Sequence, residues 1–352
     1  MLKRIISVIV VIILGFSVIT KTKATDELSL SAKSAVLIEA ESGKIVYSKN
    51  ADQRLPMAST TKIMTGLIVL ENAKLDHKFK VSSKAVGCEG TSAYLCEDDV
   101  LTIEAALYAL LLQSANDAAV ALAIEVGGSI DSFAQMMNKK AIELGLADTN
   151  FKNPSGLPAK DHYTTAKDLA IITSVALKNP DFSRIVATKS VNVKINEADR
   201  TFVNHNKLLS LYEGAIGVKT GFTKESGRCL VGAAQRDGVK LITVTLSASN
   251  DWADHKNMFD LGFKKLRSYC LFSGDSFIIE FPIAGTKSHI LASPVGEKQI
   301  TLPNSTRIAV RIERTSLLQL TAKAGDTVGY AVFYADGKEL YRAPLCALKD
   351  PN

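Results

Sequence analysis

One stretch of the sequence limits the possible folds more than any other: residues 56–70, where a proline-led loop runs into an almost wholly apolar segment. A helix that is apolar on nearly all sides must be buried, so the remaining chain is expected to pack around residues 63–70. Ser59 lies at or near the start of this helix. A serine in that position commonly caps free backbone N–H groups, which is one interpretation of this residue.

Lys62 gives the same stretch a second interpretation. Residues three apart share a helix face, so the Ser59 hydroxyl and the Lys62 amine can meet. A helix N-terminus favours negative charge, which suits a hydroxyl about to become an alkoxide. A neutral amine can take the proton, provided that burial or a second cation keeps it neutral. Ser-x-x-Lys is a short motif, so on its own it leaves both interpretations open.

The totals are those of a globular protein. The chain has 352 residues, which as a prior favours two domains and allows a large core. Hydrophobic residues make up 47% and charged residues 22%. The net charge of +6 fits a protein that works near an anionic surface such as a membrane or cell wall. The sequence has no block of Lys and Arg residues, so it does not predict nucleic-acid binding.

The first residues predict export. Lys3 and Arg4 precede an apolar run over residues 5–19, and Ala24 follows as a small residue at a plausible cleavage site. This pattern indicates a signal peptide over residues 1–24. The apolar run is short for a membrane span, and an uncleaved N-terminal anchor is the alternative.

The cysteines do not form a pattern that defines the fold. There are five, an odd number, and five in a chain of this length are no disulfide scaffold. Cys88 and Cys96 flank a short loop and fit either a disulfide or two free thiols. No Cys/His spacing matches a zinc site, so the sequence predicts no metal or cofactor.

Hydrophobic periodicity places the remaining elements. Residues 34–40 and 44–48 form a predicted hairpin, and residues 228–235 and 240–248 form two strands of an antiparallel meander. Another strand is predicted over 191–195, and a rigid turn over 153–158. Helices are predicted over residues 101–113, 118–126, 132–144, 165–177 and 252–266.

The pattern of apolar and polar residues changes near residue 274. Short alternating runs separated by turn signals predict a small all-β module of the sandwich type. We therefore expect a first domain over residues 25–273 and a C-terminal domain over 274–352. The expected strands of the second domain are 276–281, 299–302, 307–312, 328–334 and 339–341.

Ser114 and Asn116 form a second short motif, in a break between two buried helices. Ser and Asn cap helices routinely, which is the plain alternative to a functional role. Ser-x-Asn also occurs at residues 48–50 and 190–192. Only the copy at Ser114 lies at a helix–helix junction.

Lys219-Thr220-Gly221 is the third motif, on a strand that begins the meander. A Lys and a Thr on an edge strand beside a cleft can hold a carboxylate by charge and hydroxyl. Gly221 would let a substrate backbone approach closely. The alternative is a strand with a solvated Lys and a bulge Gly. The polar segment 204–209 fits either a cleft lining or an ordinary loop.

Taken in this order, the three motifs resemble the serine acyl-transfer set of penicillin-recognising enzymes. The chain resembles the D-alanyl-D-alanine carboxypeptidases, the low-molecular-mass penicillin-binding proteins, from residue 34 to about residue 345. The shared segments are Pro-x-Ala-Ser-x-x-Lys around Ser59, Asn-Pro-Ser-Gly-Leu over 153–157, and Lys-Thr-Gly-Phe-Thr over 219–223. The resemblance implies an α+β fold like that of β-lactamases and transpeptidases: an antiparallel sheet flanked by helices, a helical subdomain and a small C-terminal all-β domain.

The resemblance also implies catalytic roles. Ser59 would attack the carbonyl carbon of a peptidoglycan stem peptide ending in D-Ala-D-Ala and form an acyl-enzyme, which water then hydrolyses. Lys62 would be the base, and Ser114 would relay a proton to the leaving D-alanine. β-Lactam antibiotics would mimic the substrate and acylate Ser59.

Binding roles follow in the same way. Asn116 would hold the substrate amide, and Lys219 and Thr220 would bind the terminal carboxylate beside Gly221. The backbone N–H groups of Ser59 and Phe222 would form the oxyanion hole. Lys219 would also lower the pKa of Lys62 as a second cation.

One departure and two rivals remain. Many members of the family end in an amphipathic helix that lies on the membrane, and none is visible here, so either the N-terminal segment is a tether or the mature protein is soluble. A serine β-lactamase would share the three motifs, but we can assign no Glu that activates a deacylating water. A wall-binding or sensor protein without activity is the other rival, and the intact Ser59, Lys62, Ser114 and Lys219 weigh against it.

Overall fold

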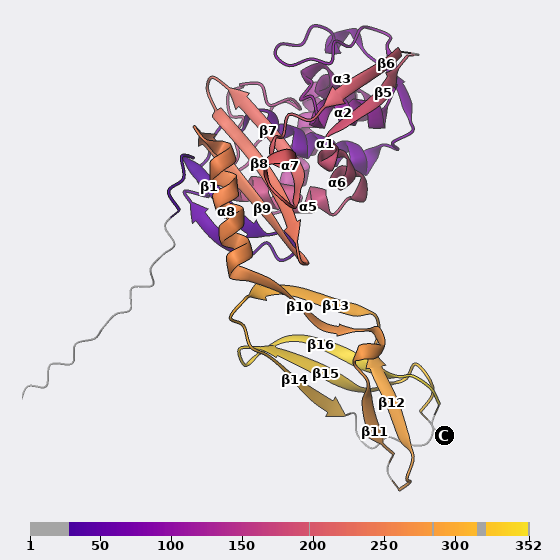
Figure 1. Cartoon of the computed structure of the whole chain (residues 1–352). Coiled ribbons are helices and arrows are strands. Elements are labelled where there is room, and N and C mark those ends of the chain that lie inside the picture. The colour runs from indigo at the N-terminus through magenta and orange to yellow at the C-terminus, as the bar shows by residue number, and fades with distance from the viewer. Residues whose placement is uncertain (1–27, 197, 284, 315–321, 351–352) are drawn as a thin grey trace, which may run out of the picture.

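A computed structural model describes residues 28–196, 198–283, 285–314 and 322–350 (Figure 1). The predicted signal peptide, residues 1–24, lies outside these described residues. An α+β part comes first and a β-only part follows it, joined through the long helix α8 (Asp251–Lys265). None of the helices in the described part of the chain has the length and hydrophobicity needed to span a bilayer.

The first part is built on an antiparallel sheet. Its strands lie in the order β2-β1-β9-β8-β7, counted over the described residues. The predicted hairpin and meander are both confirmed. Strand β1 pairs with β9, so the two ends of this part meet in the sheet, and β7 is left at the edge. The strands are β1 (Ser34–Glu39), β2 (Ile45–Lys49), β7 (Ala215–Thr223), β8 (Gly227–Arg236) and β9 (Val239–Ala248).

Helices cover both faces of this sheet. Helix α8 and the short α7 (Leu208–Leu211) lie on one face. Helices α5 (Ala166–Leu177) and α6 (Pro180–Ala187) pack on the other, together with α1 (Lys62–Asn72). Helix α1 is buried as expected, with Ile63, Met64 and Val69 fully inside. Helix α6 has no counterpart among the predicted elements.

The helical subdomain lies beyond the edge strand. It comprises α2 (Ile103–Leu111), α3 (Asn116–Gly127) and α4 (Ile130–Glu143), close to their predicted ranges. Helix α2 begins later than predicted, because residues Val100–Thr102 form β4 and pair with β3 (Lys78–Lys80). The Thr102 hydroxyl then caps α2 by accepting from the Ala105 N–H. A further hairpin joins β5 (Ser190–Ile195) to β6 (Ala198–Val203).

The C-terminal part is all β, as predicted. A five-stranded sheet in the order β11-β12-β16-β15-β14 and the pair β10-β13, as far as the chain is described, share one apolar core that includes Phe272, Phe281 and Phe333. The expected boundary at residue 273 assigned β10 to the preceding domain, whereas its ladder partner is β13. The strands are β10 (Leu266–Ser273), β11 (Ile279–Pro282), β12 (His289–Pro294), β13 (Glu297–Pro303), β14 (Ile308–Arg314), β15 (Thr327–Ala335) and β16 (Lys338–Ala347).

The cysteines are free thiols in the structure. Cys96 is exposed, whereas Cys88 is partly buried and its thiol donates to the Ala85 carbonyl at 3.2 Å. Of the two states that the sequence allows for this pair, the structure has the free thiols.

Candidate active site

Ser59 lies in a single 3₁₀ turn, η1 (Ala58–Thr61), immediately before α1. No side chain caps the start of either helix in this described segment, so the Ser59 hydroxyl is not an N-cap. Its oxygen instead lies 3.0 Å from Lys62 Nζ. The meeting of these two groups, expected from their spacing, is thus present in the structure.

Lys62 is a fully buried amine with three oxygen neighbours. Besides Ser59 Oγ, Nζ lies 2.7 Å from Asn116 Oδ1 and 2.6 Å from the Ser155 carbonyl oxygen. No part of the residue is exposed to solvent. Burial, and then the positive charge of Lys219, hold the pKa of Lys62 well below its usual value. Both causes favour the neutral amine, which is the form that can accept a proton.

The turn over residues 153–158 contacts α1 and holds Lys62 in this position. Ser155 supplies the carbonyl that meets Lys62, and the Thr65 hydroxyl donates to the Pro154 carbonyl at 2.7 Å. Gly156 has a φ of +87°, and a Cβ there would lie 1.9 Å from the Ala58 carbonyl oxygen. The sequence predicted a rigid turn here but no role for it. The Pro-Ser-Gly residues predict a turn, but they do not indicate which residues the turn contacts.

Ser114 and Asn116 lie at the helix junction as expected. Ser114 has a positive φ of +65° and Asn116 begins α3. The Asn116 amide is engaged at both ends, because its oxygen accepts from Lys62 and its nitrogen donates to the Glu89 carbonyl at 2.6 Å. It therefore positions Lys62 and the loop around Glu89 in the free protein.

The next residue, Asp117, fixes that loop. Its buried carboxylate accepts from the Ser92 hydroxyl at 2.6 Å and from the backbone N–H groups of Ala93 and Leu95, each at 3.0 Å. This anchoring brings Thr91 to the cavity described below. Neither Asp117 nor Thr91 was singled out from the sequence. An acidic residue at a helix start, such as Asp117, is normally interpreted as a cap.

Lys219 lies on the edge strand β7 but is not solvated. It is 1% exposed, and its amine donates to the Thr220 carbonyl at 2.9 Å. Burial lowers the pKa of Lys219 to about 7. The alternative of a solvated lysine on a plain strand is therefore wrong.

Gly221 is needed for a reason that the sequence did not reveal. A Cβ at this position would lie 3.0 Å from the Ser59 nitrogen and 3.1 Å from the Thr60 nitrogen. The absent side chain lets β7 approach the serine turn itself. Phe222, whose N–H was expected to form the oxyanion hole with that of Ser59, is the next residue of β7.

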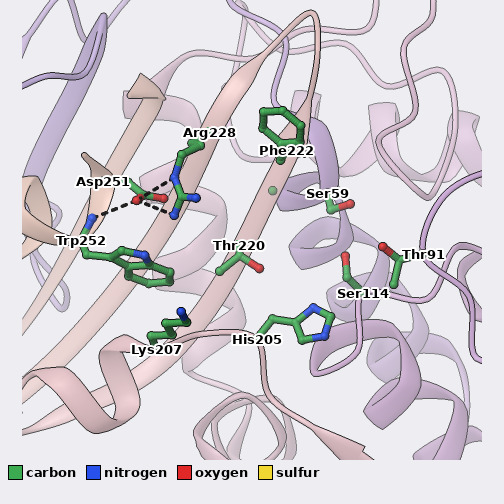
Figure 2. A pocket seen from close by; sticks show the side chains of 11 residues that line it. Ser59, Thr91, Ser114, His205, Lys207, Thr220, Phe222, Arg228, Asp251 and Trp252 are labelled. Carbon is green, nitrogen blue, oxygen red and sulfur yellow. Dashed lines mark hydrogen bonds and ion pairs between the residues drawn. The ribbon is translucent and has the colours of Figure 1, made fainter. Parts of the chain in front are cut away.

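A cavity of about 370 Å³ opens beside these groups (Figure 2). Ser59 and Ser114 lie on the helical side, and Thr220, Gly221 and Phe222 on the strand side. Lys62, Asn116 and Lys219 are not on its surface but lie buried behind it. The cavity also has lining residues that sequence analysis did not assign to the site: Thr91, His205, Lys207, Arg228, Asp251 and Trp252.

His205 and Lys207 come from the segment that fitted either a cleft or a loop, and the structure places them at the cleft. Partial burial, and then the charge of Lys219, lower the pKa of His205. Arg228, Asp251 and Trp252 reach the cavity through strand pairing and the start of α8. Nothing local in the sequence marks them.

Known proteins are similar to this chain in sequence and in fold. The family described as D-alanyl-D-alanine carboxypeptidase matches residues 20–250. The D-alanyl-D-alanine carboxypeptidase DacF of Bacillus subtilis (strain 168) is 33% identical over 342 residues, covering 93% of this chain and 88% of the relative. DacC of Escherichia coli is 30% identical over 343 residues, covering 92% and 84%.

Solved structures agree over both parts of the chain. The D-alanyl-D-alanine carboxypeptidase DacD from Francisella tularensis has a TM-score of 0.66 at 26% identity, covering 92% of this chain and 94% of that one. Penicillin binding protein 5 from Haemophilus influenzae has a TM-score of 0.69 at 25% identity, covering 93% and 99%. Because the family matches residues 20–250 and DacF is 33% identical over 93% of this chain, the chain belongs to the D-alanyl-D-alanine carboxypeptidase family.

Proposed function

We propose that this serine-type D-Ala-D-Ala carboxypeptidase removes the terminal D-alanine from peptidoglycan stem peptides through an acyl-enzyme on Ser59. The observation that carries the proposal is the 3.0 Å contact between Ser59 Oγ and the buried Lys62 Nζ. An activated serine needs a base within hydrogen-bond reach, and the contact meets that requirement.

The partners of Lys62 determine which way the proton moves. The Ser155 carbonyl and the Asn116 amide oxygen can only accept hydrogen bonds. A neutral amine has two N–H groups, and these two oxygens use both. The remaining lone pair then points at the Ser59 hydroxyl. Neutral Lys62 is therefore held in the orientation of a general base, and it takes the proton as Ser59 attacks the carbonyl carbon.

The other site residues receive roles that complete the transfer. Ser114 lines the cavity beside Ser59 and relays the proton to the nitrogen of the departing D-alanine. Asn116 orients Lys62 and, once substrate displaces its contact with Glu89, can hold the substrate amide. Lys219 acts as the second cation that keeps Lys62 neutral.

The oxyanion is assigned to two backbone donors. They are the N–H groups of Ser59 and Phe222, and the close approach of Gly221 on β7 to the serine turn supports this assignment. Fixed donors aimed at the developing negative charge are each worth roughly 3–4 kcal/mol of barrier reduction. Water then hydrolyses the acyl-enzyme, and β-lactams, which present a comparable reactive carbonyl, acylate the same serine.

The place of action follows from the substrate. Peptidoglycan lies outside the cytoplasmic membrane, and residues 1–24 carry a predicted signal peptide. We therefore propose that the enzyme is exported and works at the outer face of the membrane or in the cell wall.

A serine β-lactamase is the nearest rival, and the cavity disfavours it. Among the described residues that line the cavity, the single acidic side chain is Asp251, and its carboxylate accepts from Arg228. No lining Glu is placed to activate a water for fast deacylation. A penicillin adduct that persists supports the carboxypeptidase, whereas rapid turnover of the drug supports the rival.

The decisive variant is Ser59→Ala. Release of D-alanine from a peptide ending in D-Ala-D-Ala should be abolished, and so should the mass shift produced by penicillin, which peptide mapping should locate at Ser59 in the parent enzyme. Ser48→Ala, on an exposed position of β2, is the control and should behave like the parent. Undiminished release by Ser59→Ala would defeat the assignment, and no release by the parent would favour an inactive wall-binding protein.

A further inference from the structure

The alternation of β7 separates two residues that the sequence placed together. Successive side chains of a strand point to opposite faces, so Lys219 and Thr220 cannot both face the same ligand from one side of the sheet. Lys219 pairs with Val231, which belongs to the larger core among the helices, and Thr220 pairs with Leu230, which packs under α8. Thr220 lines the cavity and Lys219 does not.

A different cation lies on the face that Thr220 shares. Arg228 is the register partner of Phe222, and directly opposed residues of an antiparallel pair project to the same face. Its side chain is 43% exposed and lines the cavity with Thr220 and Phe222 (Figure 2). The guanidinium is thus open to a ligand, in contrast to the buried amine of Lys219.

Arg228 is held in place from behind. Its Nε and Nη2 donate to Asp251 Oδ1 at 3.0 and 2.8 Å, and the guanidinium carbon lies 5.7 Å from the centre of the Trp252 ring. The Asp251 side chain is 4% exposed and also accepts from the Trp252 N–H at the start of α8. Both contacts to Asp251 use Nε and Nη2, and within the described residues Nη1 has no protein acceptor.

We propose that Arg228 binds the terminal carboxylate of the substrate together with the Thr220 hydroxyl, and that Asp251 positions Arg228 for this contact; the proposal rests on the proposed function of this cavity. Ser59, Thr220 and Arg228 line one cavity, so a peptide whose carbonyl lies at Ser59 can reach Thr220 and Arg228 with its C-terminal carboxylate. A planar guanidinium with an unused N–H suits a carboxylate better than a buried amine does. Arg228 therefore makes the enzyme select free C-termini.

The test compares two substrates in one variant. A short acyl-D-Ala-D-Ala peptide and its C-terminal carboxamide are hydrolysed by the parent and by Arg228→Gln, and kcat/KM is measured for each. A lost charge-assisted hydrogen bond should reduce the ratio of carboxylate to amide kcat/KM by about 10- to 100-fold. Arg228→Lys keeps the charge and should restore part of that ratio.

Two further variants sharpen the result. Arg236→Gln is the matched control, because Arg236 lies on the same strand, stacks on Tyr212 and donates to the Glu213 carbonyl outside the cavity. It should keep the parent ratio. Asp251→Asn should lower the ratio in the same direction as Arg228→Gln, because the guanidinium loses its anchor.

Several outcomes would overturn the inference. Equal losses for the peptide and the amide in Arg228→Gln would mean a merely structural role, and an unchanged ratio would mean no role. If Arg228→Gln does not fold, the ratio of carboxylate to amide kcat/KM is compared between Arg228→Lys and Arg236→Gln, and the same outcomes decide. Failure of the parent to release D-alanine would defeat the proposed function, and this inference with it; normal release with an unaltered ratio would defeat the inference alone.

Discussion

Lys62 Nζ and the carbonyl oxygen of Ser155 lie 2.6 Å apart, although 93 positions of chain separate them. The contact joins the catalytic turn at the start of α1 to the turn over residues 153–158. One N–H of the Lys62 amine therefore donates to Ser155 and not to Ser59. Lys62, the proposed base, is therefore oriented by the protein before any substrate arrives, and such preorganisation lowers the cost of reaching a reactive geometry.

Replacing Lys62 should abolish the activation of Ser59 while leaving Ser59 in place. Lys62→Met is close in length and apolar, so it fits a fully buried position better than a charged substitute would. General-base catalysis contributes about 100- to 10,000-fold, and the second-order rate of acylation by penicillin should fall by that order. Intact-protein mass spectrometry over time measures this rate.

The control for this change is Lys167→Met, whose lysine lies on α5 and pairs with Asp52 at the surface. It should be acylated at the parent rate. Acylation of Lys62→Met at the parent rate, with a normal thermal transition, would show that another group is the base.

Lys219 should set the acidic limb of the pH profile. Acylation needs neutral Lys62, so its rate falls as the pH drops through the pKa of Lys62. The charge of Lys219 lowers that pKa, and Lys219→Met removes the charge. The acidic limb of the penicillin acylation rate should therefore move to higher pH in the variant. Lys207→Met, which removes an exposed cation of the cavity rim, should shift the limb less. A limb that stays at the parent pH in Lys219→Met would exclude the coupling.

Gly156 should be intolerant of any side chain. An alanine there would be strained at φ +87° and would place Cβ 1.9 Å from the Ala58 carbonyl oxygen. The positive φ alone costs roughly 1–2 kcal/mol, and the clash adds to it, so Gly156→Ala should lose more than about 2 kcal/mol of unfolding free energy. Acylation should slow as well, because the Ser59 turn must move.

Gly43→Ala is the matched control for the strain, since Gly43 has a φ of +69° and nothing within 4 Å of a Cβ. Urea denaturation and the acylation rate are measured for both variants. Equal losses of stability would mean that the contact with Ala58 adds nothing.

Two buried histidines should make the first domain acid-sensitive. Burial lowers the pKa of His162 to about 4 and that of His255 to about 3, from an ordinary value of 6.5. The folded state therefore favours the neutral imidazoles, and the unfolded state binds more protons below pH 6.5. Stability is fully present above that pH and is lost as the pH falls toward 4 and 3.

Each histidine should contribute about 1.4 kcal/mol of lost stability per pH unit in that window. Urea denaturation between pH 7.5 and 5 measures the slope. His255→Gln should have a smaller slope than the parent, and His289→Gln, at an exposed position of the C-terminal part, should keep it. An identical slope in His255→Gln would mean that this group is charged in the folded state.

Much of the architecture could be predicted from local patterns. The alternation over residues 228–248 gave the meander, and the apolar run after Lys62 gave the buried helix, because strand and helix periodicities act over a few residues. The start of α2 and the whole of α6 were missed. Residues 100–102 became a strand only because β3 lies beside them, and propensity yields to such tertiary pairing.

The sequence by itself determined the chemistry on offer: a hydroxyl and an amine one helical turn apart, and a lysine and a threonine side by side on a strand. These relations follow from backbone periodicity, which needs no distant partner. Only the tertiary structure decided which groups surround Lys62, that Lys219 is buried, and that Arg228 faces the cavity with Thr220. Those facts depend on the register between strands and on loops that close over long separations, where packing rather than local sequence selects the neighbours.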